Sequence, residues 1–221
     1  MSIPLYANYD AWLAGLRNWL STDNQPSADT GLFLYLAEQR LNRELQSVPM
    51  ETNKDVIITA FTAGLPIDLS VEIPDFNKIR LVLPFPDGPP LYSASLNEIS
   101  NLYATGASPG LVTLSAPGFF CIDANKLYLY PKPLEDQVVS VFYYPYIPPL
   151  SASVATNTFS NFHSDVLLYA ALIAGSQFVI EDERVPVWKD AYAEGLESSN
   201  NTGKHQKLGS TPLVRQIKGL S

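Results

Sequence analysis

One short motif in this 221-residue chain has the spacing of a catalytic serine. Residues 106–110 read G-A-S-P-G, and a G-x-S-x-G sequence can place a nucleophilic serine on a sharp turn between a strand and a helix. His163 and an acid such as Asp123 would complete the chain order of such hydrolases. The context is inverted, because a helix-like turn precedes the motif and a β run, residues 111–114, follows it. We therefore interpret the motif as a Gly-Pro loop, with a small serine hydrolase using Ser108 as the alternative function.

Other residues that commonly carry chemistry are scarce in the sequence. Cys121 is the single cysteine, and His163 and His205 are the two histidines. Neither a disulfide framework nor a zinc or haem ligand set can be assembled from them. His163 stands beside Asp165 in the first turn of a predicted helix, where it can act as a cap or as a packed residue. The glycine-rich phosphate-binding motifs do not occur. We expect no catalytic, cofactor-binding or metal site and no enzymatic activity.

The charge is unevenly distributed along the chain. The formal net charge is −8, which excludes the general basic footprint of a nucleic-acid-binding protein. Residues 198–221 contain four basic residues, Lys204, Lys207, Arg215 and Lys218, and no acidic one. The rest of the chain therefore holds ten Lys and Arg against 22 Asp and Glu, a net charge of −12. The basic tail and the acidic body will favour different surroundings.

Helical periodicity occurs at both ends of the chain. One helix of about three turns is predicted to end near Leu20, with Asn8 or Asp10 as its N-cap, and a second runs from a cap at Asp29 to Pro49. The two form an antiparallel hairpin. A second pair lies within residues 161–196, where the first helix is apolar almost all round and the second is amphipathic.

A membrane span is not expected from these helices. The longest apolar run, residues 166–180, is about fifteen residues long, whereas a membrane span needs about twenty. The N-terminus lacks the basic and apolar regions of a secretory signal. We expect a soluble intracellular product.

Short apolar runs separated by prolines predict β structure between the helical pairs. Residues 119–130 read as a hairpin with its turn at 123–125, and Ser95 with Glu98 reads as a capping box. The predicted strands are 56–61, 65–69, 79–83, 111–114, 119–122, 126–130 and 138–144.

The predicted fold class is α+β with three parts. N- and C-terminal helical hairpins, residues 1–50 and 155–200, form a four-helix body. An inserted β-rich domain of sandwich or barrel type spans residues 51–154. Residues 201–221 form an extended C-terminal arm, since a packed domain has no need of a further apolar and basic segment unless it orders on something else. A flexible tail without a function is the alternative.

Two sets of residues are candidates for binding other proteins. Charged pairs on the second helix and the apolar surface of the C-terminal helices could face a neighbouring copy, although alternating charges also form ordinary surface pairs. The residues around Tyr144 and Pro145 offer a weaker candidate, a partner face or simply a packed strand end. The predicted interface residues are Arg40, Arg43, Tyr169, Phe178, Trp188 and Tyr192. The predicted binding residues of the arm are Lys204, Lys207, Leu208, Pro212, Leu213, Val214, Arg215, Ile217 and Lys218.

Four segments in order resemble the head-to-tail adaptor proteins of tailed bacteriophages, of the short-tailed type. They are LAEQRLNREL at 36–45, CIDANKLYLYPKP at 121–133, FYYPYIPPL at 142–150 and the stretch from His163 to Leu196. The chain departs from the family at Ser164, where many members have a proline, and in the tail after Asn201, which has no family pattern.

The resemblance implies a virion protein of the neck or tail, made in the host cytoplasm. Such proteins form a ring, commonly a dodecamer, that docks beneath the portal protein and extends the DNA channel towards the tail nozzle. The C-terminal extension reaches the portal, genomic DNA passes without specific binding, and no membrane is involved. An acidic body would suit a channel wall to which DNA should not adhere.

Overall fold

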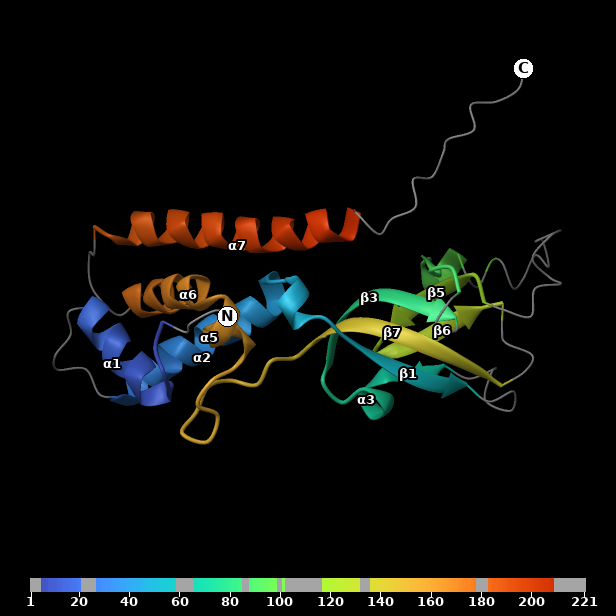
Figure 1. Ribbon diagram of the computed structural model, residues 1–221, viewed down its shortest axis with the longest axis horizontal. Coiled ribbons are helices and arrows are strands. Elements are labelled where there is room, and N and C mark those ends of the chain that lie inside the picture. The colour runs from blue at the N-terminus through green and yellow to red at the C-terminus, as the bar shows by residue number, and fades with distance from the viewer. Residues whose placement is uncertain are drawn as a thin grey trace, which may run out of the picture. The chain divides into compact units, whose positions relative to one another are not determined.

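The computed structural model divides the chain into two compact units (Figure 1). The helical unit contains Met1–Met50 and Ile147–Ser221, and the β unit contains Glu51–Tyr146. Each unit is described by itself. The described residues are 5–20, 27–58, 66–84, 88–98, 101, 117–131, 136–177 and 183–208.

The helical unit is arranged around helix α6, Ser164–Ser176. Helices α2, Ser27–Glu44, and α7, Val185–Leu208, both pack on α6, which lies between them (Figure 1). Helix α1, Tyr9–Leu20, packs on α6 and α2, and the short α5, Thr158–Phe162, precedes α6. A 3-10 turn, η1, occupies Val48–Met50.

Helix α6 is buried on several sides, as its apolar sequence predicts. Eight of its residues are buried, from Val166 to Gly175. The glycine allows close packing, because a Cβ at Gly175 would lie 2.9 Å from Leu20 Cδ1 and 3.1 Å from Phe33 Cδ2. A larger residue there would require these side chains of α1 and α2 to shift.

The helix boundaries agree with a local capping signal at α1 but differ from the predicted bounds at α2 and α7. Asn8, and not Asp10, caps α1, since its Oδ1 accepts a hydrogen bond of 2.9 Å from the backbone of Ala11. Helix α2 begins at Ser27, before Asp29, and ends at Glu44, before Pro49. Helix α7 continues to Leu208, so residues 201–208, which we expected to begin the extended arm, are helical.

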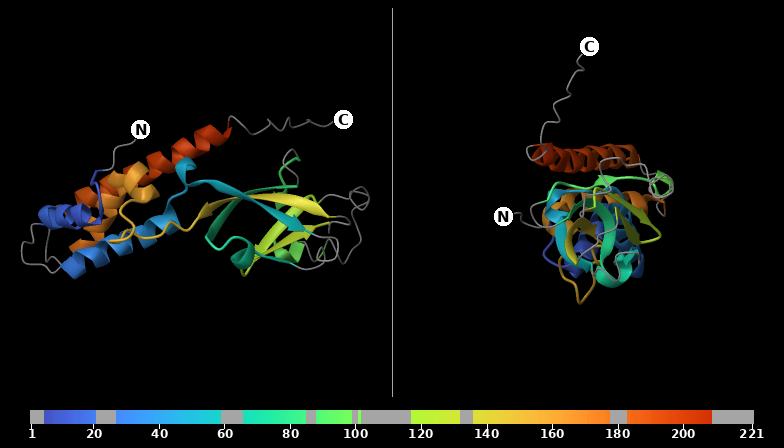
Figure 2. Two further views of the ribbon diagram at one scale, coloured as in Figure 1. Left: turned by 60° about the horizontal axis from the view of Figure 1, so that its bottom comes forward. Right: turned by 90° about the vertical axis from the view of Figure 1, so that its right-hand side faces the viewer.

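The β unit contains two sheets. The first has the order β1-β7-β3, with Thr52–Ile58, Gln137–Pro145 and Phe76–Pro84 all antiparallel; β7 is yellow in Figures 1 and 2. The second has the order β2-β6-β5-β4, from Ile67–Asp68, Lys126–Tyr130, Phe119–Asp123 and Tyr92–Ser93. One buried cluster contains side chains from both sheets, among them Val56, Val82, Phe120 and Val139.

Local sequence signals in the β unit are confirmed where the structure describes them. Asp123 pairs with Lys126 across a two-residue turn in which Ala124 and Asn125 have φ of 48° and 62°, the left-handed geometry of a tight hairpin. Ser95 and Glu98 form the predicted capping box, with bonds of 2.7 and 3.2 Å. These features depend only on neighbours in sequence.

Other β predictions need correction. The expected strand 65–69 is reduced to Ile67–Asp68, because Asp68 caps the short helix α3, Leu69–Glu72, by accepting a hydrogen bond from the backbone of Ser70. Strand β4 and helices α3 and α5 were not predicted. The expected strand 111–114 lies outside the described residues.

The chain returns to the helical unit earlier than predicted, at Ile147 instead of residue 155. Two polar residues of α2 bind this returning backbone. Asn42 donates to the carbonyl of Ile147 at 3.0 Å and accepts from its N–H at 2.9 Å. The Glu38 carboxylate accepts from the N–H of Leu150 at 3.0 Å and from Asn157 Nδ2 at 2.6 Å. Residues 147–150 are thus part of the helical unit because α2 supplies partners for their backbone.

In the described part of the chain, no helix combines the length and the apolar character needed to cross a membrane.

Candidate functional site

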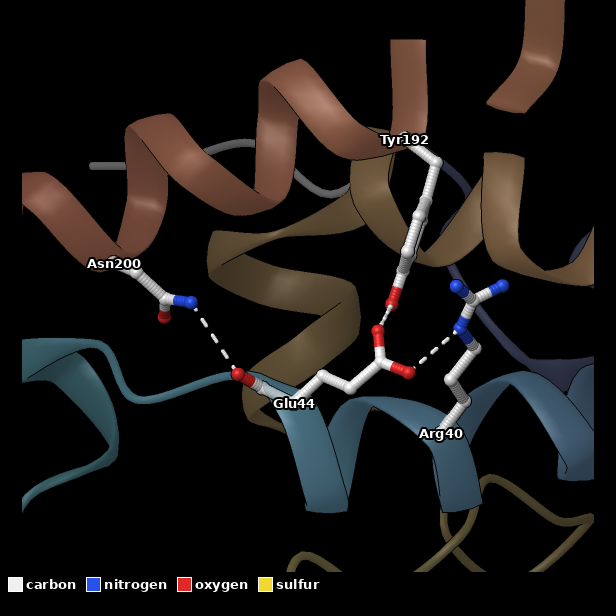
Figure 3. Close-up of polar contacts among 4 residues, drawn as sticks. All are labelled: Arg40, Glu44, Tyr192 and Asn200. Atoms are coloured by element: carbon white, nitrogen blue, oxygen red, sulfur yellow. Dashed lines mark hydrogen bonds and ion pairs between the residues drawn. The ribbon is translucent and has the colours of Figure 1, made fainter. Parts of the chain in front are cut away.

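Two of the predicted interface residues, Arg40 and Tyr192, meet where α7 crosses the end of α2 (Figure 3). The Tyr192 hydroxyl donates to Glu44 Oε2 at 2.6 Å, and Arg40 Nε donates to Glu44 Oε1 at 3.0 Å. The Arg40 guanidinium also lies 4.1 Å from the centre of the Tyr192 ring, a cation–π distance. We call these residues, together with Asn200, the α2–α7 junction.

Asn200 completes the junction two turns further along α7. Its Nδ2 donates to the carbonyl of Glu44 at 3.3 Å, and its Oδ1 accepts from the N–H of Gln46 at 2.8 Å. The last carbonyls of a helix lack partners within the helix, so Asn200 satisfies the C-terminus of α2 from another element. No signal in the sequence identifies Asn200, since its partners lie about 155 residues away.

The electrostatics of the junction favour structure over catalysis. Burial, followed by the hydrogen bond to Glu44, raises the pKa of Tyr192 well above its ordinary value. The phenol therefore remains a hydrogen-bond donor and cannot serve as a base near neutral pH. The junction fastens α7 to α2.

An open groove of about 460 Å³ lies beside the junction. Its lining contains two basic residues, Arg40 and Lys189, and two acidic residues, Glu44 and Glu197. The described residues include no group of three His, Cys, Asp or Glu side chains placed to hold a metal. The groove is lined by side chains of α2, α6 and α7 and lies within the helical unit.

The predicted interface residues separate into buried and exposed groups. Trp188 and Tyr192 are each 3% exposed in the single chain. The expectation that they face a neighbouring copy needs correction, because packing inside the helical unit leaves them almost no surface to offer. Arg43 is exposed and Tyr169 is half-buried, while Phe178 lies outside the described residues.

The predicted arm is described only in part. The backbone positions of Lys204, Lys207 and Leu208 belong to α7. The remaining residues predicted to bind the portal, from Pro212 onwards, lie outside the described residues.

His163 is a packed residue and not a side-chain cap. Its Nε2 lies 2.7 Å from Ser47 Oγ and its Nδ1 lies 3.2 Å from Ser199 Oγ. Burial lowers its pKa, opposed by the nearby Asp165. The two ring nitrogens thus connect the start of α6 to Ser199 of α7 and to Ser47, the residue before η1. This leaves the hydrolase alternative without support, and Ser108 lies outside the described residues.

The aromatic strand end also has mainly structural contacts. Tyr143 donates to Asp75 Oδ1 at 2.9 Å and Tyr144 donates to Glu51 Oε1 at 3.1 Å. Both tyrosines are buried, whereas Tyr146 is 40% exposed. The sequence left open a partner face or a packed strand end, and Tyr143 and Tyr144 form a packed strand end within the β unit.

Replacing the hydroxyl of the junction tests its contribution. Tyr192→Phe removes the hydrogen bond to Glu44 but leaves Arg40 to pair with that carboxylate. We expect a loss of about 1–2 kcal/mol in the free energy of unfolding, measured by chemical denaturation. Tyr35→Phe, on the exposed side of α2, is the control and should change it by less than about 0.5 kcal/mol. Equal effects of the two variants would show that the bond adds nothing.

Comparison with known proteins identifies the family. A sequence model described as SU10 adaptor protein matches residues 7–216. No curated protein matches the chain. The matched region contains both units and nearly the whole length, including the α2–α7 junction. The chain belongs to the SU10 adaptor protein family.

Proposed function

We propose that this protein is a ring-forming adaptor of a short-tailed bacteriophage, which joins the portal protein to the tail nozzle and extends the DNA channel. The observation that carries the proposal is the family match over residues 7–216, which supports a structural phage adaptor and a virion component. The ring is a dodecamer, its helical part is a four-helix body, and genomic DNA passes through it without specific binding.

The helical unit supports the ring with its central helix. Because α6 is buried between α2 and α7, the outer faces of these two helices lie on opposite sides of the unit. A subunit with two different contact faces can repeat head to tail around a closed axis.

The charge distribution supports the other two contacts. The body has a net charge of −12, and an acidic lumen would repel DNA and let it slide. The basic tail, with apolar residues such as Leu213 and Ile217 between its charges, is the arm that binds the portal.

Deleting residues 209–221 tests the arm while leaving the whole of α7 in place. We expect the truncated chain to unfold at the same temperature as the full chain, because the packed helices are unchanged. It should fail to bind heads that carry the portal but lack this protein, as measured by co-sedimentation. A full-length variant with Arg215→Glu and Lys218→Glu should bind more weakly, which separates charge from length. Normal binding by the truncated chain would refute the role of the arm.

Particle mass and symmetry test the ring itself. Wild-type protein, alone at high concentration and bound to portal-bearing heads, should form a closed ring that image reconstruction resolves. A protein that remains monomeric in both settings would contradict the proposal. A hydrolytic activity of the purified protein that Ser108→Ala abolishes would instead establish the alternative.

A further inference from the structure

The outer face of α2 is apolar at one end and basic at the other. Leu32, Tyr35 and Leu36 are 46%, 46% and 43% exposed, and Arg43 is exposed seven residues after Leu36. Residues spaced by three, four and seven positions share one side of a helix. The opposite side of α2 is buried and packs on α6. Three large exposed apolar side chains on one helix mark a contact surface.

The outer face of α7 has a complementary pattern. Val187 is 65% exposed, and Asp190 and Glu194 follow it as exposed residues at positions three and seven. The opposite face of α7 holds the buried Trp188 and Tyr192. Thus α7 presents one apolar residue followed by two carboxylates.

The two patterns have the same spacing. Seven residues separate Leu36 from Arg43, and seven separate Val187 from Glu194, about 10 Å along each helix. When the two helices lie parallel, Val187 can cover the apolar end of α2 while Arg43 meets Glu194. The two faces lie on opposite sides of α6 within one chain, so one copy cannot make this contact with itself.

We propose that the outer face of α2 binds the outer face of α7 of a second copy of this chain. The contact is head to tail, so each copy uses both faces, and it repeats until the ring closes. This inference rests on the proposed ring and names the surfaces that build it. In place of Trp188 and Tyr192, which are buried, it assigns the contact between copies to outward residues of α2 and α7.

Charge reversal with reciprocal rescue tests the contact. Arg43→Glu and Glu194→Lys should each weaken association at least about tenfold per interface, measured by native mass spectrometry and sedimentation of the full chain. Mixed in equal amounts, the two variants should assemble again, because alternation restores an opposite-charge pair at every interface. Asp123→Lys, an exposed reversal in the β unit, should assemble like the wild type. Rescue in the mixture also shows that both variants are folded.

Cysteine cross-linking gives an independent measurement. A chain carrying Leu36→Cys and Val187→Cys should form a ladder of disulfide-linked oligomers on oxidation, while each single replacement should remain monomeric, because its cysteine faces an unreplaced residue of the neighbouring copy. The native Cys121 is buried and should not contribute.

The outcomes separate this inference from the proposed function. If Arg43→Glu alone formed rings as the wild type does, or if the double-cysteine ring gave no ladder on oxidation, the α2–α7 contact would be overturned. The proposed adaptor function would then still stand. Absence of any wild-type ring, alone or on portal-bearing heads, would overturn both.

Discussion

Raising the pH from below 4.5 to above 7 will lower the free energy of unfolding by about 3 kcal/mol through one carboxyl group, that of Glu38. This side chain is fully buried. Burial raises its pKa from 4.5 to about 7, although the bonds from Leu150 and Asn157 oppose the change. Each pKa unit corresponds to about 1.4 kcal/mol, which sets the size of the effect.

The sign follows from proton binding. Between pH 4.5 and 7 the folded protein keeps its proton on Glu38 while the unfolded chain releases it. The folded state therefore binds more protons, and stability falls as the pH rises. Below pH 4.5 both states are protonated and the contribution of Glu38 is complete.

Glu38→Gln separates this group from all other titrating groups. The variant stays neutral, so the difference in unfolding free energy, wild type minus variant, should fall by about 3 kcal/mol from pH 4 to pH 8. Chemical denaturation at several pH values gives the difference. Glu98→Gln, at an exposed site where hydrogen bonds from Ser95 lower the pKa, is the control and should not reproduce this fall. Parallel pH curves for wild type and Glu38→Gln would contradict the prediction.

Asn42→Ala should destabilise the helical unit by about 2–4 kcal/mol. Asn42 binds both polar groups of the Ile147 backbone, at 2.9 and 3.0 Å, and both residues are buried. Alanine leaves a buried N–H and a buried carbonyl without these partners, and each such group costs about 1–3 kcal/mol. The expected result is a lower denaturation midpoint with an unchanged slope.

Asn18→Ala provides the matched control on an exposed position of α1. Alanine has the higher helix propensity, so this variant should be neutral or slightly more stable, by up to about 0.5 kcal/mol. If Asn42→Ala were equally mild, the backbone of Ile147 would have to find other partners, and residues 147–150 would not depend on α2.

Several elements were predictable because their causes lie within a few residues of chain. The hairpin at 119–130, the capping box at Ser95 and the Asn8 cap of α1 each depend on neighbours in sequence. The apolar character of α6 likewise predicts that it is covered on several sides, since a helix that is apolar all round needs several neighbours, and the structure places these neighbours within the chain. The mixed α+β class follows from the same periodicities.

The partners of an amphipathic face were not predictable in the same way. The stripe of Trp188 and Tyr192 could pack on the chain's own helices or on another subunit, and both choices bury the same apolar area. The structure shows the first, which moves the candidate interface to the opposite face, around Val187 and Glu194. Tyr192 donates a hydrogen bond to Glu44, which lies 148 residues earlier in the sequence. Helical periodicity gives no information about partners at such a separation.

The sequence by itself determined the order of helical pair, β-rich insert and helical pair, the apolar helix that needs several neighbours, the acidic body with its basic tail, and the resemblance to phage adaptors. These depend on local spacing and on composition, which folding does not change. Only the tertiary structure decided that Asn42 and Glu38 bind the returning chain at 147–150, that Asn200 closes α2, and which faces of α2 and α7 remain outside. Those features arise from hydrogen bonds and packing between segments more than 100 residues apart, and such pairings exist only once the chain has folded.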